Sequence, residues 1–274
     1  MVDTHTHVVA SDRERYPLSP RPLSGAWYDE APCSAPELAD RMDAAGVDRA
    51  VLVQGVGAYS FDNRYAVDSA ARAPERFTAA CCVDPAGPDP VAELSGWLAR
   101  EAVGGVRLFA LAARGASWLV DPVADSLFAC ADRHGAHVIV TILARQLPEL
   151  RAALERHPRV PVSLDHCAFP DVAAPEPLFA LADLPNLHLK VSTHVLDAAV
   201  RAEGSAAPFV EKLVARFGAG RVMWGSDFCQ THDRSYAELA ALGRQAFADL
   251  PDDARDACLG RTALRLWPGL AGAG

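Results

Sequence analysis

"HVIVTILARQLPELRAALERHPRVPVSLD", residues 137–165, decides the fold. It begins with an apolar run at 137–143, continues with a helical pattern at 145–158 and ends with a second apolar run at 160–165. The two runs are apolar almost throughout and do not alternate with polar residues, which is typical of strands buried on both faces of a parallel sheet. This stretch therefore predicts a strand, a covering helix and a second, parallel strand.

The same alternation continues in both directions along the chain. Apolar runs of this kind occur eight times, at residues 1–5, 49–54, 76–83, 104–109, 137–143, 160–165, 187–192 and 221–227. Helical patterns separate them; one begins at Ser34, which forms a capping box with Glu37, and another follows residue 89 and ends on Gly104 and Gly105.

Eight β/α units in 274 residues predict a (β/α)8 TIM barrel, distorted and formed by a single domain over residues 1–274. We expect a long Pro-rich loop at 16–34 after the first strand, and closing helices in the tail at 251–267. The alternative is a doubly wound open sheet, but no G-x-G-x-x-G fingerprint follows the first run.

Composition limits the possible partners and the location. The formal net charge is −9 and no basic cluster occurs, which argues against nucleic acid as a partner. No apolar run approaches the roughly 20 residues of a membrane span, and the N-terminus lacks a secretory pattern, so we expect a cytoplasmic protein. The seven cysteines form no C-x-x-C pair, which predicts free, mostly buried thiols. A homodimer is compatible with the Ala- and Leu-rich helices.

Two histidines stand two residues apart on the first predicted strand. His5 and His7 point to the same face, about 6.6 Å apart along the strand, so both can reach one metal ion. An H-x-H pattern alone is a weak signal, because carbonyl groups or solvent can satisfy each ring. His166 follows the sixth run and Asp227 ends the eighth. Because the carboxyl ends of parallel strands meet on one rim, these four side chains are predicted to share a polar cavity.

Seven segments carry a specific resemblance. They are "DTHTHVV", "GVDRAVLVQ", "FDNRYAVDSA", "GGVRLF", "LDHCAFP", "RVMWGSD" and "GRTALRLW". The chain resembles the amidohydrolase-related superfamily, and most closely its branch of TIM-barrel hydrolases with the sugar-acid lactonases and 2-pyrone-4,6-dicarboxylate lactonase. This resemblance implies a site at the strand ends and hydrolysis of a lactone, an ester or an amide.

The resemblance also assigns roles. His5 and His7 would be the ligands from the first strand, His166 the histidine of the sixth strand, and Asp227 the carboxylate of the eighth. Metal-dependent members commonly carry a histidine at the end of strand five, where this chain has Thr141. The lactonase-like branch shares that departure, and some of its lactonases work without metal, so a dinuclear site is not expected.

One divalent ion is therefore predicted on His5, His7 and Asp227, with zinc as the first candidate and manganese as the second. Asp227 would orient a water molecule and take its proton, while His166 polarises the substrate carbonyl. In a metal-independent variant, Asp227 would act as the base alone.

A small-molecule substrate needs further contacts from the loops. Arg107 and Arg145 could each pair with a substrate carboxylate, although either could instead form a structural ion pair. The weaker candidates for substrate binding are Tyr59, His194, His232 and Trp27. Two alternatives remain: a decarboxylase or isomerase of the same superfamily, or a catalytically silent ligand-binding barrel. The decarboxylases normally keep the strand-five histidine, and a silent barrel would be expected to lose one of the four main site residues.

Overall fold

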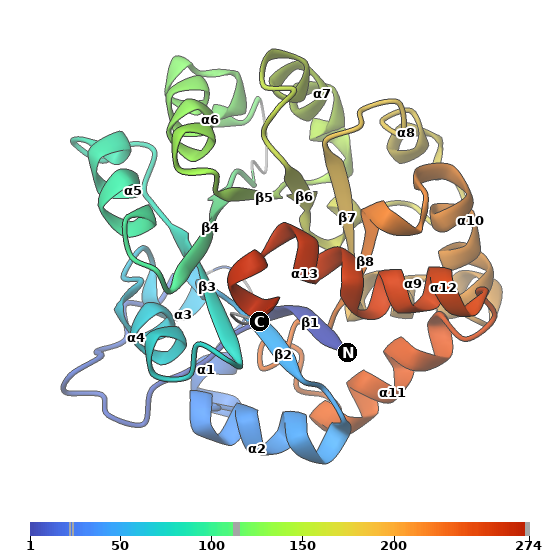
Figure 1. Ribbon diagram of the computed structural model, residues 1–274, viewed down its shortest axis with the longest axis horizontal. Coiled ribbons are helices and arrows are strands. Elements are labelled where there is room, and N and C mark those ends of the chain that lie inside the picture. Colours follow the sequence, from blue (N-terminus) through green and yellow to red (C-terminus); the bar gives the residue numbers. More distant parts are fainter. Residues whose placement is uncertain (22, 24, 112–115, 272–274) are drawn as a thin grey trace.

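Eight parallel strands form one sheet, in the order of the chain, with helices around the outside (Figure 1). The computed structural model describes residues 1–21, 23, 25–111 and 116–271. The strands are β1 (Val2–Thr6), β2 (Arg49–Val53), β3 (Phe77–Cys82), β4 (Val103–Phe109), β5 (His137–Thr141), β6 (Val162–Leu164), β7 (Leu187–Ser192) and β8 (Val222–Gly225). All eight predicted strands are confirmed.

The sheet closes where its first and last strands meet. Thr6 forms a parallel bridge with Phe228, just beyond β8. The backbone N–H of Asp227 donates to the carbonyl of His5 over 2.8 Å, and the Thr4 hydroxyl donates to the carbonyl of Trp224 over 2.7 Å. The predicted (β/α)8 barrel is confirmed, and the doubly wound open sheet is excluded.

Helices surround the barrel. The α-helices are α1 (Trp27–Glu30), α2 (Ala35–Ala45), α3 (Val56–Tyr59), α4 (Arg64–Arg72), α5 (Pro90–Leu98), α6 (Pro122–His134), α7 (Leu147–Arg156), α8 (Glu176–Phe179), α9 (Thr193–Glu203), α10 (Ala207–Phe217), α11 (Tyr236–Ala246), α12 (Asp252–Asp256) and α13 (Thr262–Leu266). The short 3-10 and π segments are η1 (Trp118–Val120), η2 (Ala144–Gln146), η3 (Asp165–Ala168), η4 (Ala219–Arg221), η5 (Ala257–Arg261) and η6 (Pro268–Ala271). The predicted capping box of Ser34 and Glu37 is present at the start of α2.

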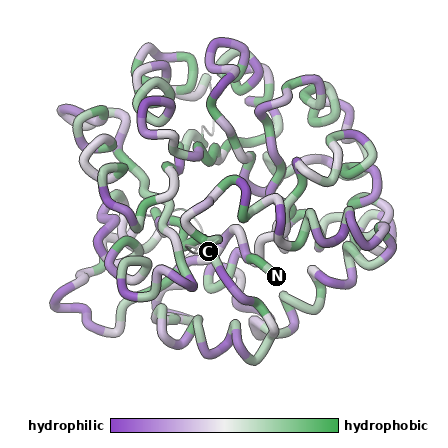
Figure 2. Tube along the Cα trace, viewed as in Figure 1, coloured by the Kyte–Doolittle hydropathy of each residue, from purple (hydrophilic) through white to green (hydrophobic). Residues whose placement is uncertain are grey.

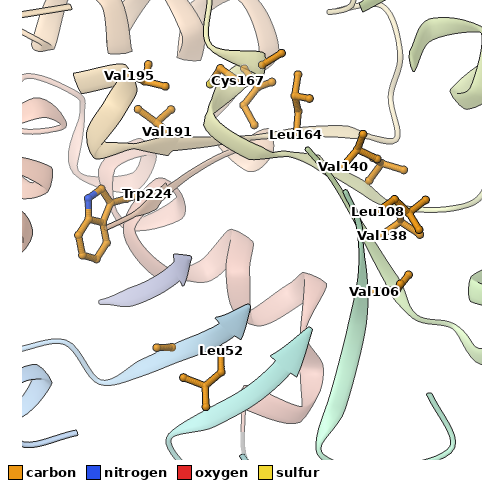
Figure 3. Close-up of a cluster of buried hydrophobic side chains, with 14 of the residues drawn as sticks. Leu52, Val106, Leu108, Val138, Val140, Leu164, Cys167, Val191, Val195 and Trp224 are labelled. Carbon is orange, nitrogen blue, oxygen red and sulfur yellow. The ribbon is translucent and has the colours of Figure 1, made fainter. Parts of the chain in front are cut away.

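The main core lies between the sheet and the surrounding helices. Outward-facing strand residues such as Leu52, Leu108, Val140 and Trp224 are fully or almost fully buried there (Figure 3). In Figure 2 the strands are mostly hydrophobic, whereas polar residues concentrate on the outer helices. All seven cysteines are buried and free in the described structure, as predicted.

The C-terminal segment closes the amino end of the barrel. Trp267 and Leu270 pack against Val51, Ile139 and Met223 in a separate buried cluster. Figure 1 shows α13 across this end of the barrel, with the N-terminus nearby. The predicted closing helices are therefore confirmed, and the carboxyl end of the barrel is the end available for a site.

One local prediction was wrong. The helix after residue 89, α5, ends at Leu98, and Gly104 and Gly105 lie inside β4 instead of ending that helix. A Cβ atom on Gly105 would lie 2.5 Å from the His137 carbonyl oxygen, so a close strand approach requires this glycine. No helix in the described parts of the chain has the length and apolar character that a membrane crossing needs.

Candidate active site

Two histidines and one aspartate converge at the carboxyl end of the barrel. The Nε2 atoms of His5 and His7 each lie 3.4 Å from Oδ1 of Asp227, and all three side chains are buried. None of these three atoms has a hydrogen-bond partner among the described residues. Three unpartnered buried atoms that face one another are rare in a folded protein, and they indicate a missing common partner.

The opposite nitrogen of each ring fixes its orientation. Nδ1 of His7 lies 2.8 Å from the carbonyl of Val53, and Nδ1 of His5 lies 3.0 Å from Oδ1 of Asp165. An acceptor at Nδ1 places the ring proton there and leaves the lone pair on Nε2. Burial lowers the pKa of His5 well below its usual value, so that ring is neutral near pH 7. Both Nε2 atoms are therefore arranged as ligands.

Asp227 presents one carboxylate oxygen to these rings. Its other oxygen, Oδ2, accepts hydrogen bonds from Nε2 of His194 over 3.0 Å and from the Thr231 hydroxyl over 3.2 Å. Burial by itself would raise the pKa of Asp227, but the hydrogen bond from His194 and the nearby histidines outweigh it and hold the pKa well below its usual range. Asp227 is ionised, and Oδ1 is directed at His5 and His7.

These residues fit a divalent metal ion. A tetrahedral ion with ligand bonds of about 2.1 Å separates its ligand atoms by about 3.4 Å, which matches the two Nε2–Oδ1 distances. Neutral imidazole and carboxylate are the donors that zinc accepts, and manganese shares the carboxylate preference. Asp165 stands behind His5, in the position from which a carboxylate would orient that histidine if it bound a metal ion.

Asp165 is the centre of a buried charge cluster that the sequence did not reveal. Nε of Arg107 lies 3.0 Å from Oδ2 of Asp165, the Thr141 hydroxyl donates to the same oxygen over 2.7 Å, and Nζ of Lys190 lies 3.4 Å from Oδ1. Burial would raise the pKa of Asp165, but His5, Lys190 and Arg107 hold it well below its usual range. Thr141, which stands at the end of strand five, thus holds the Asp165 carboxylate that contacts His5.

A strained turn carries His166 into the site. The four residues His166–Phe169 all have positive φ angles, between 51° and 62°. Residues with a Cβ atom pay roughly 1–2 kcal/mol each for this conformation, and such strain is typical of functional sites. The His166 ring lies 4.9 Å from that of His5, and its Nδ1 lies 2.7 Å from the Ser192 hydroxyl. Burial lowers the pKa of His166 to about 4, so it is neutral near pH 7.

A cavity of about 210 Å3 opens beside these groups. Five polar side chains are among the described residues that line it: Arg107, Thr141, His166, His194 and Gln230. A larger cleft of about 1240 Å3 lies at the opposite end of the barrel, around Met1 and Arg76. The histidine and aspartate cluster adjoins the smaller cavity, which is therefore the candidate substrate site.

Comparison with known proteins identifies the family. The amidohydrolase family model matches residues 2–269, which is nearly the whole chain. The chain belongs to the amidohydrolase family. A curated relative, L-fucono-1,5-lactonase of Burkholderia ambifaria, is 29% identical to this amidohydrolase over 237 residues, which cover 83% of this chain and 79% of the relative.

Solved structures share the fold of this amidohydrolase. An amidohydrolase from Burkholderia multivorans with bound zinc superposes with a TM-score of 0.79 at 23% identity, over 97% of this chain and 98% of the other. A putative 2-pyrone-4,6-dicarboxylic acid hydrolase from Pseudomonas putida gives a TM-score of 0.76 at 24% identity, over 98% and 97%. The predicted family and its lactonase branch are confirmed.

The remaining predicted site residues of the amidohydrolase divide into two groups. Arg107 and His194 line the cavity, although each is also bonded to an aspartate. Arg145 in η2 is exposed and lies outside the cavity lining of the described residues. His232 is also exposed and outside that lining, and its Nε2 lies 3.2 Å from a carboxylate oxygen of Glu30.

Two aromatic candidates pack instead of lining the described cavity. The Tyr59 hydroxyl accepts a hydrogen bond from the backbone N–H of Ala10 over 2.8 Å. This bond anchors the segment that follows β1. Trp27 is buried with its ring 5.5 Å from that of His7. The long loop at 16–34, of which residues 22 and 24 lie outside the described residues, thus covers His7 from the outside.

Proposed function

We propose that this amidohydrolase hydrolyses a small lactone or ester, with one zinc ion on His5, His7 and Asp227. The observation that supports this proposal most directly is the convergence of three buried atoms without partners, Nε2, Nε2 and Oδ1, beside a small cavity. A divalent ion bound there would lower the pKa of a water molecule towards about 7.

The chain's own residues perform the proton transfers and the charge stabilisation. Asp227 accepts the proton of the attacking water, and His194 keeps the carboxylate in position through Oδ2. When the Ser192 hydroxyl donates to Nδ1 of His166, Nε2 of that ring carries its proton and can donate to the substrate carbonyl oxygen.

The bond changes balance as follows. The water oxygen bonds to the carbonyl carbon, and the bond between that carbon and the ester oxygen breaks. The proton taken by Asp227 passes to the leaving oxygen, so the product is a hydroxy acid. Arg107 is the candidate contact for a substrate carboxylate, because it lines the cavity whereas Arg145 does not.

A lactone panel tests the proposal. The purified protein, loaded with zinc, is assayed by proton release on simple alkyl lactones, sugar-acid lactones and pyrone dicarboxylate, beside the Asp227→Asn variant. We expect the wild type to hydrolyse at least one class and the variant to lose this activity. An inactive wild type on every lactone and ester, with zinc or manganese supplied, would contradict the proposal.

Chelation tests the metal separately. Removal of the ion should abolish hydrolysis, and zinc should restore it. Full activity after complete removal of metal would show that Asp227 works as the base alone, and it would reject the proposed zinc ion without rejecting the hydrolase.

A further inference from the structure

The proposed metal ligands stand on the two sides of one seam in the barrel, the contact between β1 and β8. His5 lies in β1, His7 follows it, and Asp227 follows β8. The neighbouring strands from β1–β2 to β7–β8 are joined by parallel ladders, whereas the described residues of this seam form one isolated bridge, Thr6 with Phe228. The relative position of the ligands therefore depends on bonds other than a regular ladder.

Strand β1 is also irregular on its other side, against β2. Asp3 is paired with Ala50 and Thr6 with Leu52, so three steps along β1 match two along β2. His5 lies within this shift of register. Such a bulge re-aims side chains and disrupts the ladder, and a buried backbone group at a bulge needs another partner.

The carboxylate of Asp3 is a partner for both sides of the seam. Its Oδ1 accepts the backbone N–H of His5 over 3.1 Å and that of Ser226, the residue before Asp227, over 2.9 Å. The Tyr236 hydroxyl, on α11, donates to Oδ2 over 3.1 Å. Asp3 is fully buried. One carboxylate oxygen thus joins the backbone of a ligand from β1 to the backbone beside the ligand from β8.

Asp3 itself lies away from the reacting groups. It is outside the described cavity lining, and neither group of described side chains that could hold an ion includes it. We propose, on the basis of the proposed metal site, that Asp3 is a positioning residue. It sets the 3.4 Å separation between Nε2 of His5 and Oδ1 of Asp227, because its carboxylate holds the backbone segments that carry these two ligands.

A metal site tolerates little displacement of its ligands, whose distances must agree with the ideal values to within about 0.2 Å. Without the Asp3 carboxylate, the N–H groups of His5 and Ser226 are buried without a partner, and their segments move to satisfy them. The bond from the Asp227 N–H to the His5 carbonyl still crosses the seam, as does that from Thr4 to Trp224. These bonds keep the barrel closed but let the segments turn about them, so the ligand geometry changes in a folded protein.

Titration calorimetry with zinc on the metal-free protein compares the wild type with Asp3→Ala and Asp3→Asn. Asp3→Ala should bind zinc about 10- to 100-fold more weakly, as expected when a group that orients a ligand is lost. Asp3→Asn should stay within about 3-fold of the wild type, because its amide oxygen can accept both N–H groups. Equal affinity in Asp3→Ala and the wild type, or equal loss in both variants, would overturn the inference while the proposed metal site stands. A wild type that binds no zinc would overturn both.

The visible absorption of the cobalt-substituted protein separates positioning from stability, because the spectrum reports the coordination geometry of the ion. At saturating cobalt the band of Asp3→Ala should differ from that of the wild type in intensity and position, whereas Asp3→Asn should keep it. Ser163→Ala is the control: it removes a buried hydrogen bond of 2.6 Å to Nε2 of His137, away from the seam, and should lower stability without changing the spectrum. A spectrum of Asp3→Ala identical to that of the wild type would overturn the inference.

Tyr236→Phe tests the same link in a protein that keeps Asp3, and it decides the matter if Asp3→Ala does not fold. It removes the donor to Oδ2 and leaves both N–H bonds to Oδ1. Zinc affinity should fall by about 2- to 10-fold, the effect of one hydrogen bond. Tyr65→Phe is the matched control, since that buried hydroxyl accepts the N–H of Ala35 outside the barrel and should not affect zinc. Equal zinc affinity in the two variants would overturn the inference.

Discussion

At the residue scale, the site depends on which nitrogen of each of the two histidine rings, His5 and His7, forms a hydrogen bond within the protein. Nδ1 of His7 donates to the Val53 carbonyl, and Nδ1 of His5 donates to the Asp165 carboxylate. Both Nε2 atoms are therefore left beside Asp227. The Val53 acceptor is a backbone carbonyl, which a substitution cannot remove. The Asp165 acceptor is a side-chain carboxylate, so a substitution of Asp165 tests the arrangement. This carboxylate also balances the positive charges of Arg107 and Lys190.

Asp165→Asn should weaken zinc binding by about 10- to 100-fold, because His5 loses the carboxylate that orients it. Unfolding should also become easier by roughly 3–5 kcal/mol, since Arg107 and Lys190 stay buried without their counter-charge. Titration calorimetry with zinc and thermal unfolding measure the two effects. Asp183→Asn, at an exposed ion pair with Arg151, is the control and should change neither. Unchanged zinc affinity in Asp165→Asn would remove Asp165 from this role.

Asp227→Asn should lower kcat/KM by about 100- to 10,000-fold, because the amide cannot accept the proton of the water. The amide oxygen can still accept from His194, so the circular dichroism spectrum should match that of the wild type. Initial rates on the best lactone substrate give the measurement. Rates like those of the wild type would exclude Asp227 as the base.

At the scale of the elements, close packing between strands depends on glycine. Gly105 in β4 faces the His137 carbonyl so closely that a Cβ atom would lie 2.5 Å from that backbone oxygen, which no side-chain movement can relieve. Gly96 in α5 has no atom within 4 Å of an added Cβ. The same substitution should thus have opposite effects in the two elements.

Gly105→Ala should destabilise the protein by more than about 2 kcal/mol, through strand displacement. Gly96→Ala should stabilise it by roughly 0.5–1 kcal/mol, because alanine is the better residue within a helix. Urea unfolding of both variants provides the comparison. Equal midpoints for the two would contradict the packing described for β4.

Much of the fold could be predicted from the sequence because buried parallel strands leave continuous apolar runs. His5, His7, His166 and Asp227 were predicted to meet because they stand at strand ends, and the carboxyl ends of parallel strands share a rim. Asp165 and its partners could not be predicted, since they depend on which residues of β4, β5 and β7 reach the same level inside the barrel. Lysine at 190, in an apolar run, was the visible signal of that cluster.

At the scale of the whole molecule, buried neutral histidines make stability depend on pH. Burial lowers the pKa of His166 and His188 to about 4 and that of His5 and His137 well below the usual value. As the pH falls below about 6.5, the unfolded chain takes up protons that the folded chain refuses, so stability decreases. Asp3 and His194 oppose this change, because burial raises the pKa of Asp3 to about 6 and the hydrogen bond with Asp227 raises the pKa of His194.

The free energy of unfolding of the metal-free protein should therefore decrease between pH 7 and pH 5. Each of the four histidines contributes a loss of roughly 2 kcal/mol over this interval, and the two opposing groups, Asp3 and His194, do not cancel their sum, so the net loss should be at least about 2 kcal/mol. Urea unfolding at both pH values measures it. An unchanged or higher unfolding free energy at pH 5 would show that these rings are not buried as neutral groups.

Anomalous diffraction at the zinc absorption edge, from crystals of the zinc-loaded protein, tests the central claim most directly. We predict one anomalous peak per chain, within bonding distance of Nε2 of His5, Nε2 of His7 and Oδ1 of Asp227. No peak at that position, or zinc bound only by other residues, would contradict it.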